Sequence, residues 1–418
     1  MHRVRTTLTA RAGAALAVLA ALLVAPSPAG ATESPAPLGD VRRAVFVGNN
    51  WDGTADVLAP GSFERLGRID VVPDREERMA EITADPVRTA YYLAIQQEIG
   101  EGHDQLVDDM YSTRNGRRLV VSRPSFADVV AISLRTGRIV WRFPVAGYRS
   151  DHMAMSPDGR RVVVSASTAD VVHVLRVRDG KEVGRFPSGG SPHESVFIDG
   201  GRRILHASIG MVYSPLDQPE ADATKQERRL EIVDARTFKV LRKYDLRKAL
   251  DAAGMERTST AVRPLTLSPD DQTFYFQVSF FHGFLEMDRA NGEITRVKHL
   301  PNLVKDMPRE QYVLDSAHHG IAMNPAGTKI CVAGTMSDYA TVVDARTFHR
   351  GKLLMGGLKP YWVTPSWDGR TCYISWSGSD KISKISYRTG RIVQSVKVGD
   401  HPQRVRNGYV ARSLVKDL

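Results

Sequence analysis

Seven of the twelve histidines in the chain follow a spacing that chemistry can use. They lie near the starts of consecutive repeated units, or in loops that emerge on the same side of those units: His103, His152, His193, His282, His318, His319 and His401. Neutral imidazole is a good ligand for copper, zinc, iron and nickel, and it also exchanges protons near neutral pH. Several imidazoles that meet on one axis therefore predict either a transition-metal site or a general acid–base site.

The metal candidates are histidines about seven residues before the turn glycine of a repeat. This position carries His152, His193 and His401, and in a further repeat His319 directly precedes it. We expect these four side chains to hold one transition metal, copper or zinc, at the mouth of a central channel. The alternative is that they hydrogen-bond channel water and neighbouring backbone, since ligands spread over separate repeats are a weaker signal than a local metal motif.

Proton transfer has its own candidates, namely His193, Glu194 and His282. Glu194 follows His193 directly and is a candidate proton-transfer partner for it. Because consecutive residues of a strand point to opposite faces, we expect at most one of the two to face the channel axis.

Other polar and aromatic residues of the predicted channel mouth are candidates for ligand binding: Asp104, Arg263, Lys359, Tyr361, Trp362 and Arg404. Inward arginines favour an anionic ligand through paired hydrogen bonds, although surface solvation explains them equally well. The sequence contains no phosphate loop, nucleophile elbow, haem-attachment motif or zinc-protease motif, so no reaction can be inferred from local sequence.

A self-similar unit of about 30 residues positions these side chains. Residues 111–143 and 155–186 share a template that returns from residues 197, 267, 323 and 365: a short strand, an Asp-Gly-type turn, an alternating strand, a polar loop, a third strand, an Arg-Thr-Gly-type turn and a fourth strand. Four antiparallel strands per unit are typical of a propeller blade.

Six units occupy residues 105–398, and the two ends of the chain supply a seventh. The stretch from Arg43 to Val72 contains three strands, and the stretch from His401 contains the missing one. Pairing them closes the ring and removes exposed sheet edges, so we also expect a monomer. The sequence thus predicts an all-β fold, one seven-bladed β-propeller over residues 43–418, after a flexible linker at 32–42.

The turns resemble those of a known family. Ser-Pro-Asp-Gly turns, Thr-Gly and Ala-Arg-Thr turns and the closing sequence VGDHPQRV from Val398 are similar to those of the YVTN-repeat (YncE-like) propellers, over residues 40–415. The resemblance implies the propeller fold and a secreted or periplasmic protein. It does not settle a function, because one fold hosts many activities.

Four insertions interrupt the repeats, at residues 76–104, 214–228, 247–262 and 301–317, with helical patterns at 86–100 and 246–254. In the predicted topology all four emerge on one face, while the turns of the other face are short. Loops of this length are usually lids or binding elements, although insertions also accumulate wherever they do no harm.

Composition and the N-terminus bound the setting. Residues 1–31 combine three arginines, an apolar run from Ala14 to Ala25 and the site Ala-Gly-Ala, the pattern of a Sec-type signal peptide. No later stretch is apolar enough to span a bilayer. The Lys and Arg residues that give the formal net charge of +10 are scattered, so neither nucleic acid nor integral membrane association is expected.

The two cysteines test the alignment of the blades. Cys331 lies four residues after its turn glycine and Cys372 three, so they are expected to face each other between consecutive sheets. Packed sheets lie about 10 Å apart, and this spacing predicts buried thiols rather than a disulfide.

Two functional hypotheses remain open on the sequence. The first is a secreted propeller that binds a small or peptidic ligand in the histidine-rich channel, with metal-dependent oxidoreductase, lyase or hydrolase chemistry on an exported metabolite. The second is a non-catalytic envelope scaffold that binds protein or polysaccharide, for which the histidines would be dispensable.

Overall fold

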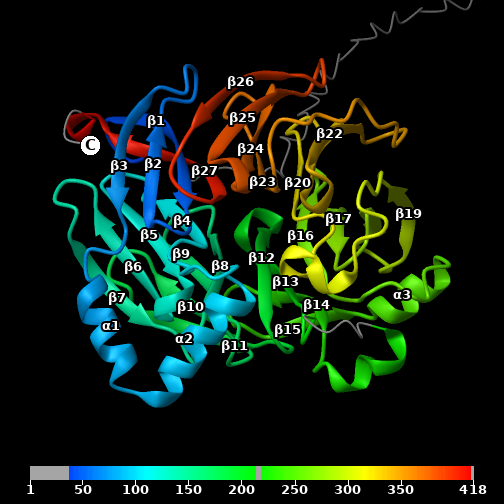
Figure 1. The fold of residues 1–418 in the computed structure, drawn as a ribbon, viewed down its shortest axis with the longest axis horizontal. Coiled ribbons are helices and arrows are strands. Elements are labelled where there is room, and N and C mark those ends of the chain that lie inside the picture. Colours follow the sequence, from blue (N-terminus) through cyan, green and yellow to red (C-terminus); the bar gives the residue numbers. More distant parts are fainter. Residues whose placement is uncertain (1–36, 213–217, 416–418) are drawn as a thin grey trace, which may run out of the picture.

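The chain folds into a ring of antiparallel sheets around a central axis, as Figure 1 shows in a view along that axis. The computed structural model describes residues 37–212 and 218–415, so the predicted signal peptide lies outside the described residues. Seven sheets follow one another in chain order, and each innermost strand contacts the innermost strand of the next sheet. The predicted seven-bladed β-propeller is confirmed.

The blades comprise these strands, from the axis outward. Blade 1 contains β27 (Pro402–Ala411), β1 (Val41–Asn49), β2 (Thr54–Leu58) and β3 (Arg65–Asp70); blade 2 contains β4 (Asp109–Ser112), β5 (Arg118–Arg123), β6 (Asp128–Ser133) and β7 (Ile139–Pro144); blade 3 contains β8 (Ser150–Met155), β9 (Arg161–Ala166), β10 (Val171–Arg176) and β11 (Glu182–Pro187); blade 4 contains β12 (Pro192–Ile198), β13 (Arg203–Ser208), β14 (Arg229–Asp234) and β15 (Val240–Tyr244); blade 5 contains β16 (Val262–Leu267), β17 (Thr273–Val278), β18 (Gly283–Asp288) and β19 (Ile294–His299); blade 6 contains β20 (Gly320–Met323), β21 (Lys329–Gly334) and β22 (Tyr339–Asp344); blade 7 contains β23 (Pro360–Pro365), β24 (Thr371–Trp376), β25 (Lys381–Ser386) and β26 (Ile392–Lys397).

Two blades depart from the regular pattern. Blade 1 is closed by the chain ends, since β27 pairs with β1 from Val41↔Ala411 onward, so the first strand starts inside the predicted linker. In blade 6 the fourth strand is reduced to two isolated bridges, Ala340↔Leu354 and Val343↔Arg350. Both arrangements cover the sheet edges that would otherwise be open to pairing.

Burial explains why the middle strands are rich in Val and Ile. In β9 the run from Val162 to Ala166 is buried without alternation, because each blade is covered on both faces by its neighbours. The outermost strand β26 instead alternates half-buried and exposed residues. Apolar packing between blades therefore holds the ring, and the strands at the axis are left free to carry polar groups.

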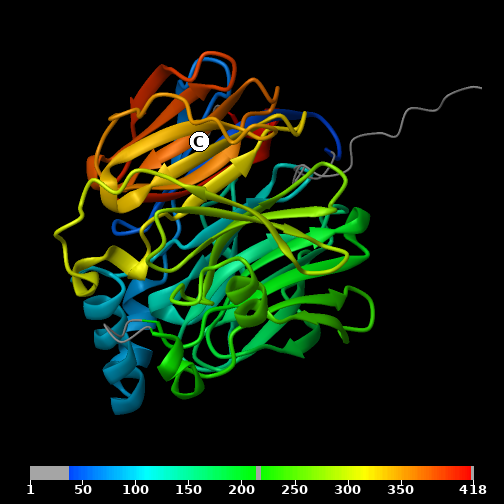
Figure 2. The same ribbon diagram turned by 90° about the vertical axis from the view of Figure 1, so that its right-hand side faces the viewer.

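The long connections lie on one face, as predicted. They are residues 71–108, 209–228, 245–261 and 300–319, each of which joins a fourth strand to the next first strand or a second strand to a third. The first holds α1 (Arg75–Thr83) and α2 (Pro86–Glu98), and the third holds α3 (Leu246–Ala252). Figure 2 shows α1, α2 and the yellow segment around residues 309–315 on the same side of the ring.

The expectation of free thiols is wrong, because Cys331 and Cys372 form a disulfide between blades 6 and 7. Their Cα atoms are 6.6 Å apart, well below the usual distance between packed sheets. Blades converge toward the axis of a propeller, so second strands of neighbouring blades come closer than two parallel layers would. The predicted facing of the two side chains is correct, and only the spacing was misjudged.

Candidate functional site

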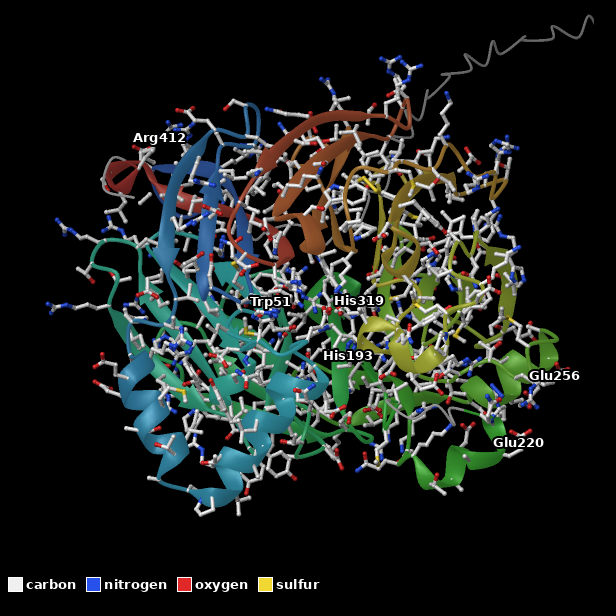
Figure 3. The ribbon with its side chains drawn as sticks, viewed as in Figure 1. Trp51, His193, Glu220, Glu256, His319 and Arg412 are labelled. Carbon is white, nitrogen blue, oxygen red and sulfur yellow. A yellow bond between two sulfur atoms is a disulfide. The ribbon has the colours of Figure 1, made fainter. Side chains whose placement is uncertain are left out.

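Three histidines from three blades meet at the axis. His152 of β8, His193 of β12 and His319, which directly precedes β20, each offer a ring nitrogen, and these atoms lie within 4.8 Å of one another. The ring centroids of His152 and His193 are 3.9 Å apart, and His319 stands nearly perpendicular to both. All three side chains are buried. Figure 3 shows His193 and His319 at the centre of the ring. We call these three residues the histidine cluster.

A bulge in the first strand of each blade aims these side chains. In β8 the pairing with β9 skips from Ser150 to Met153, and β12 shows the same skip between Pro192 and Ser195. Such a bulge leaves two consecutive residues outside the ladder and re-aims their side chains. The bulged pair in blade 4 is therefore His193 and Glu194.

The structure differs from the expectation that only one member of this pair faces the axis. The ring of His193 packs on that of His152, and Oε2 of Glu194 lies 2.7 Å from Nδ1 of the same imidazole. Alternation applies to regular strands, and the bulge suspends it here.

Glu194 fixes the protonation of His152. When its carboxylate is ionised, Nδ1 of His152 carries the proton and donates it to Glu194, which leaves the Nε2 lone pair available to a metal. Burial raises the pKa of Glu194 to about 7, and the charges of Arg404 and Arg406 oppose that rise.

Two aspartates flank the other nitrogen of His152. Oδ1 of Asp151 lies 3.5 Å from Nε2 and Oδ1 of Asp108 lies 4.0 Å from it. These three residues form a second group whose ligand atoms lie within 4.8 Å of one another. Burial raises the pKa of Asp108 to about 7. The site therefore combines nitrogen donors with carboxylate oxygens on one side.

Burial and nearby arginines keep the histidine cluster neutral. Desolvation lowers the pKa of His152, His193 and His319 well below the ordinary value, and the charges of Arg404 and Arg263 add to this effect. A neutral imidazole is the form that binds a metal, so no proton has to leave before binding near neutral pH. Within the described chain, Nδ1 of His193 and Nδ1 of His319 have no hydrogen-bond partner.

Blade 7 contributes the aromatic wall. Tyr361 stacks on His319 with ring centroids 4.1 Å apart, and Trp362 lies edge-on to His152 at 6.2 Å. These two residues form the bulged pair of β23, since its ladder skips from Pro360 to Val363. Arg404, from blade 1, stacks on the other partner, with its guanidinium carbon 3.6 Å from the centre of the Trp362 ring.

His401 does not join the histidine cluster. It stacks on Trp51 at 3.8 Å, and His103 stacks on Trp51 at 3.9 Å, so the indole lies between two imidazoles. The reason is register: β27 pairs with β1 at Pro402 and then skips, so its bulged residues are Gln403 and Arg404. The counted spacing placed blade 1 out of register, because its second strand lies at the other end of the chain.

Three further predicted residues lie apart from the histidine cluster. His282 contacts Tyr312, with 3.0 Å between Nε2 and the hydroxyl, and packs edge-on to His318. Asp104 accepts hydrogen bonds from Arg75, Tyr92 and Gln96 and so ties the helical insertion together, while Lys359 forms an ion pair with Glu101 of the same insertion. The last two fasten the insertion to the ring.

Sequence reasoning missed two charged residues, Asp108 and Arg149. Arg149 directly precedes β8 and forms an ion pair with Asp151 at 2.5 Å. Asp108 adjoins Asp109, the residue that the spacing did select in blade 2. Only the register of the bulges would have identified them, and that register is absent from a single sequence.

The arrangement can bind a transition metal through two or three neutral imidazoles, with a carboxylate to orient one of them and aromatic walls around the rest. Among the described residues no helix is both long and apolar enough to span a membrane. No protein-family model matches the chain, and no curated protein is significantly similar to it.

Proposed function

We propose that this protein binds a transition metal, copper or zinc, through His152, His193 and His319 in its central channel. The observation that carries the proposal is the approach of three buried ring nitrogens, from three different blades, to within 4.8 Å of one another. Burying three imidazoles side by side costs free energy unless something binds them, because their unpaired nitrogens lose water.

The donor chemistry supports copper or zinc. Imidazole suits both metals, and the histidine cluster contains no thiolate, since both cysteines are in the disulfide. The hydrogen bond from His152 Nδ1 to Glu194 matches the carboxylate–histidine pairs that orient metal ligands. Three protein ligands leave a coordination position for a substrate or water, which is typical of catalytic rather than structural sites.

We propose that this open position serves a small or peptidic ligand. A bound metal would supply Lewis-acid or redox chemistry for an oxidoreductase, lyase or hydrolase reaction. The protein's own residues would orient the metal through Glu194, close the site with Tyr361 and Trp362, and exclude water beneath the inserted helices. A non-catalytic envelope scaffold is the alternative, and it would have no use for a buried cluster of this kind.

We propose export as the setting, with residues 1–31 as the signal peptide. The disulfide supports an oxidising compartment, because such bonds are rare in the reducing cytosol. Membership of the YVTN-repeat family stays a prediction on the turn sequences.

Metal content is the direct test. The purified protein is exposed to copper, zinc, iron and nickel, desalted and analysed by plasma mass spectrometry. We expect close to one copper or zinc ion per chain, lost in the double variant His152→Ala/His193→Ala and retained in His349→Ala, which removes an exposed histidine of an outer turn.

Two results would overturn the proposal. One is a protein that retains no transition metal after loading. The other is a double variant that keeps its metal, which would place the ion elsewhere. A partner protein or polysaccharide bound equally well by wild type and double variant, together with no metal, would favour the scaffold.

A further inference from the structure

One buried arginine beside the histidine cluster has an unused pair of donors. Arg404 is fully buried, and its Nε donates to the backbone oxygen of Asp108 at 3.2 Å. Its two terminal nitrogens, Nη1 and Nη2, form no hydrogen bond with any residue that the structure describes. Leaving the donors of a buried charged group unpaired is costly, so this fork points to a missing acceptor.

The nearest carboxylate does not fill that role. Oδ2 of Asp108 lies 3.7 Å from Nη2, which is longer than a hydrogen bond. Two other buried arginines show how this chain pairs its guanidinium groups. Arg406 forms two hydrogen bonds with Asp109, at 2.9 and 2.7 Å, and Arg123 forms two with Asp128, both at 2.8 Å. Arg404 is built differently, with its side chain fixed and its fork open.

Packing fixes the direction of that fork. The guanidinium lies on the face of Trp362, and its Nε hydrogen bond holds the plane from the opposite edge. Both Nη groups are therefore presented together, in the geometry that matches two oxygens of a carboxylate or phosphate.

The fork opens next to the proposed metal ligands. The carboxylate of Asp108 lies between them, with one oxygen 4.0 Å from Nε2 of His152 and the other 3.7 Å from Nη2 of Arg404. Trp362 also contacts both residues. An oxyanion on Arg404 would thus lie within one small molecule's length of the histidine cluster.

We propose that the ligand of this site carries an oxyanion, a carboxylate or a phosphate, which Arg404 holds through both Nη groups while the rest of the molecule faces the histidine cluster. This inference rests on the proposed function, since it names the class of ligand bound beside the metal. Arg149 and Arg263 add positive charge around the same site, although both have protein partners.

Titration calorimetry on the metal-loaded protein tests the inference, with succinate and inorganic phosphate as probes. We expect saturable binding of at least one probe, and a Kd at least about tenfold higher in Arg404→Gln. Arg404→Lys keeps the charge but removes the fork, and should weaken binding by an intermediate factor. The control Arg135→Gln changes an exposed arginine of an outer turn and should bind as wild type does. Tighter binding of succinate assigns a carboxylate, and tighter binding of phosphate assigns a phosphoryl group.

Metal content, measured on the same samples, separates the two proposals. A protein without metal contradicts the proposed function, whereas a metal-loaded protein that binds neither probe, or binds both equally well in the Arg404 variants, overturns this inference alone. If Arg404→Gln fails to fold, the Arg404→Lys comparison and a crystal structure of wild type with phosphate remain. Phosphate within hydrogen-bond distance of Nη1 and Nη2 supports the inference, and phosphate bound only elsewhere overturns it.

Discussion

Blade 1 and blade 3 begin their innermost strands differently, although each carries a histidine that counting from the turn makes equivalent. In blade 3 the histidine is the second bulged residue, and His152 turns into the axis. In blade 1 the histidine comes before the strand, where His401 has φ 52° and packs on Trp51. The second bulged residue of blade 1 is Arg404.

This difference shows that the bulge, and not the distance from a turn, decides which side chains reach the axis. Ser191 and Lys359 precede their strands with the same left-handed backbone as His401, with φ of 48° in both. These three positions are equivalent in the ring, and none of them joins the histidine cluster. Bulged residues meet at the axis, whereas the residues before the strands contact the loops above it.

The sharpest way to break this comparison is to remove one histidine from each class. His319→Ala should weaken metal binding by at least about 100-fold, because it deletes one of three ligands. His401→Ala should leave the metal Kd within about threefold of wild type, since its ring contacts Trp51 and not the metal ligands. Competition against a chelator of known affinity measures both. Equal losses in the two variants would contradict the division.

Much of the fold was predictable from sequence, for a physical reason. Turn glycines and alternating apolar residues recur in each repeat, and antiparallel strands with tight turns leave few alternatives to a closed ring. The pairing of β27 with β1 followed from the missing strand at residue 43, and the helix at α2 from its periodicity.

The site was only partly predictable. His152, His193 and His319 were selected correctly as neighbours, because inner strands start at one face of any propeller. The link from Glu194 to His152 was not, since it depends on a bulge that a single sequence does not reveal. The disulfide was missed for a similar reason: its formation depends on the distance between two sheets, and that distance varies with radius.

The next largest effect should come from the carboxylate behind the metal ligand. Glu194→Gln removes the charge that fixes the proton on His152 Nδ1, and should weaken metal binding by about 10- to 100-fold. The matched control is Glu182→Gln, because Glu182 holds Nδ1 of His173 at 2.8 Å in the same way but far out in blade 3. Only the first variant should change the metal Kd, measured by the same competition. A loss in both would indicate general destabilisation.

A buried glutamate of blade 4 sharpens the comparison between carboxylates with and without a partner. Both side-chain oxygens of Glu231 lack a hydrogen bond among the described residues, and burial raises its pKa to about 7. The folded state then binds this proton more tightly than the unfolded state, so Glu231 lowers stability as the pH rises from about 4.5 to 7.

Glu231→Gln removes this ionisation. The variant should gain about 1–2 kcal/mol over wild type at pH 7.5, with the difference shrinking toward zero at pH 4. Denaturant unfolding across that range measures it. A difference that stays constant with pH would show that Glu231 does not ionise on unfolding.

The smallest effect concerns the stack above the axis. His103 closes the insertion of α1 and α2 onto Trp51 through one face of the indole, and His103→Ala should cost about 0.5–1 kcal/mol of unfolding free energy. The metal Kd should not change, because His103 belongs to the loops and not to the bulges. Hydrogen exchange along residues 86–98 should become faster, while His349→Ala should leave it as in wild type. If His103→Ala instead weakened metal binding, the loops would share in the site, and the division between bulged and preceding residues would no longer separate function from fastening.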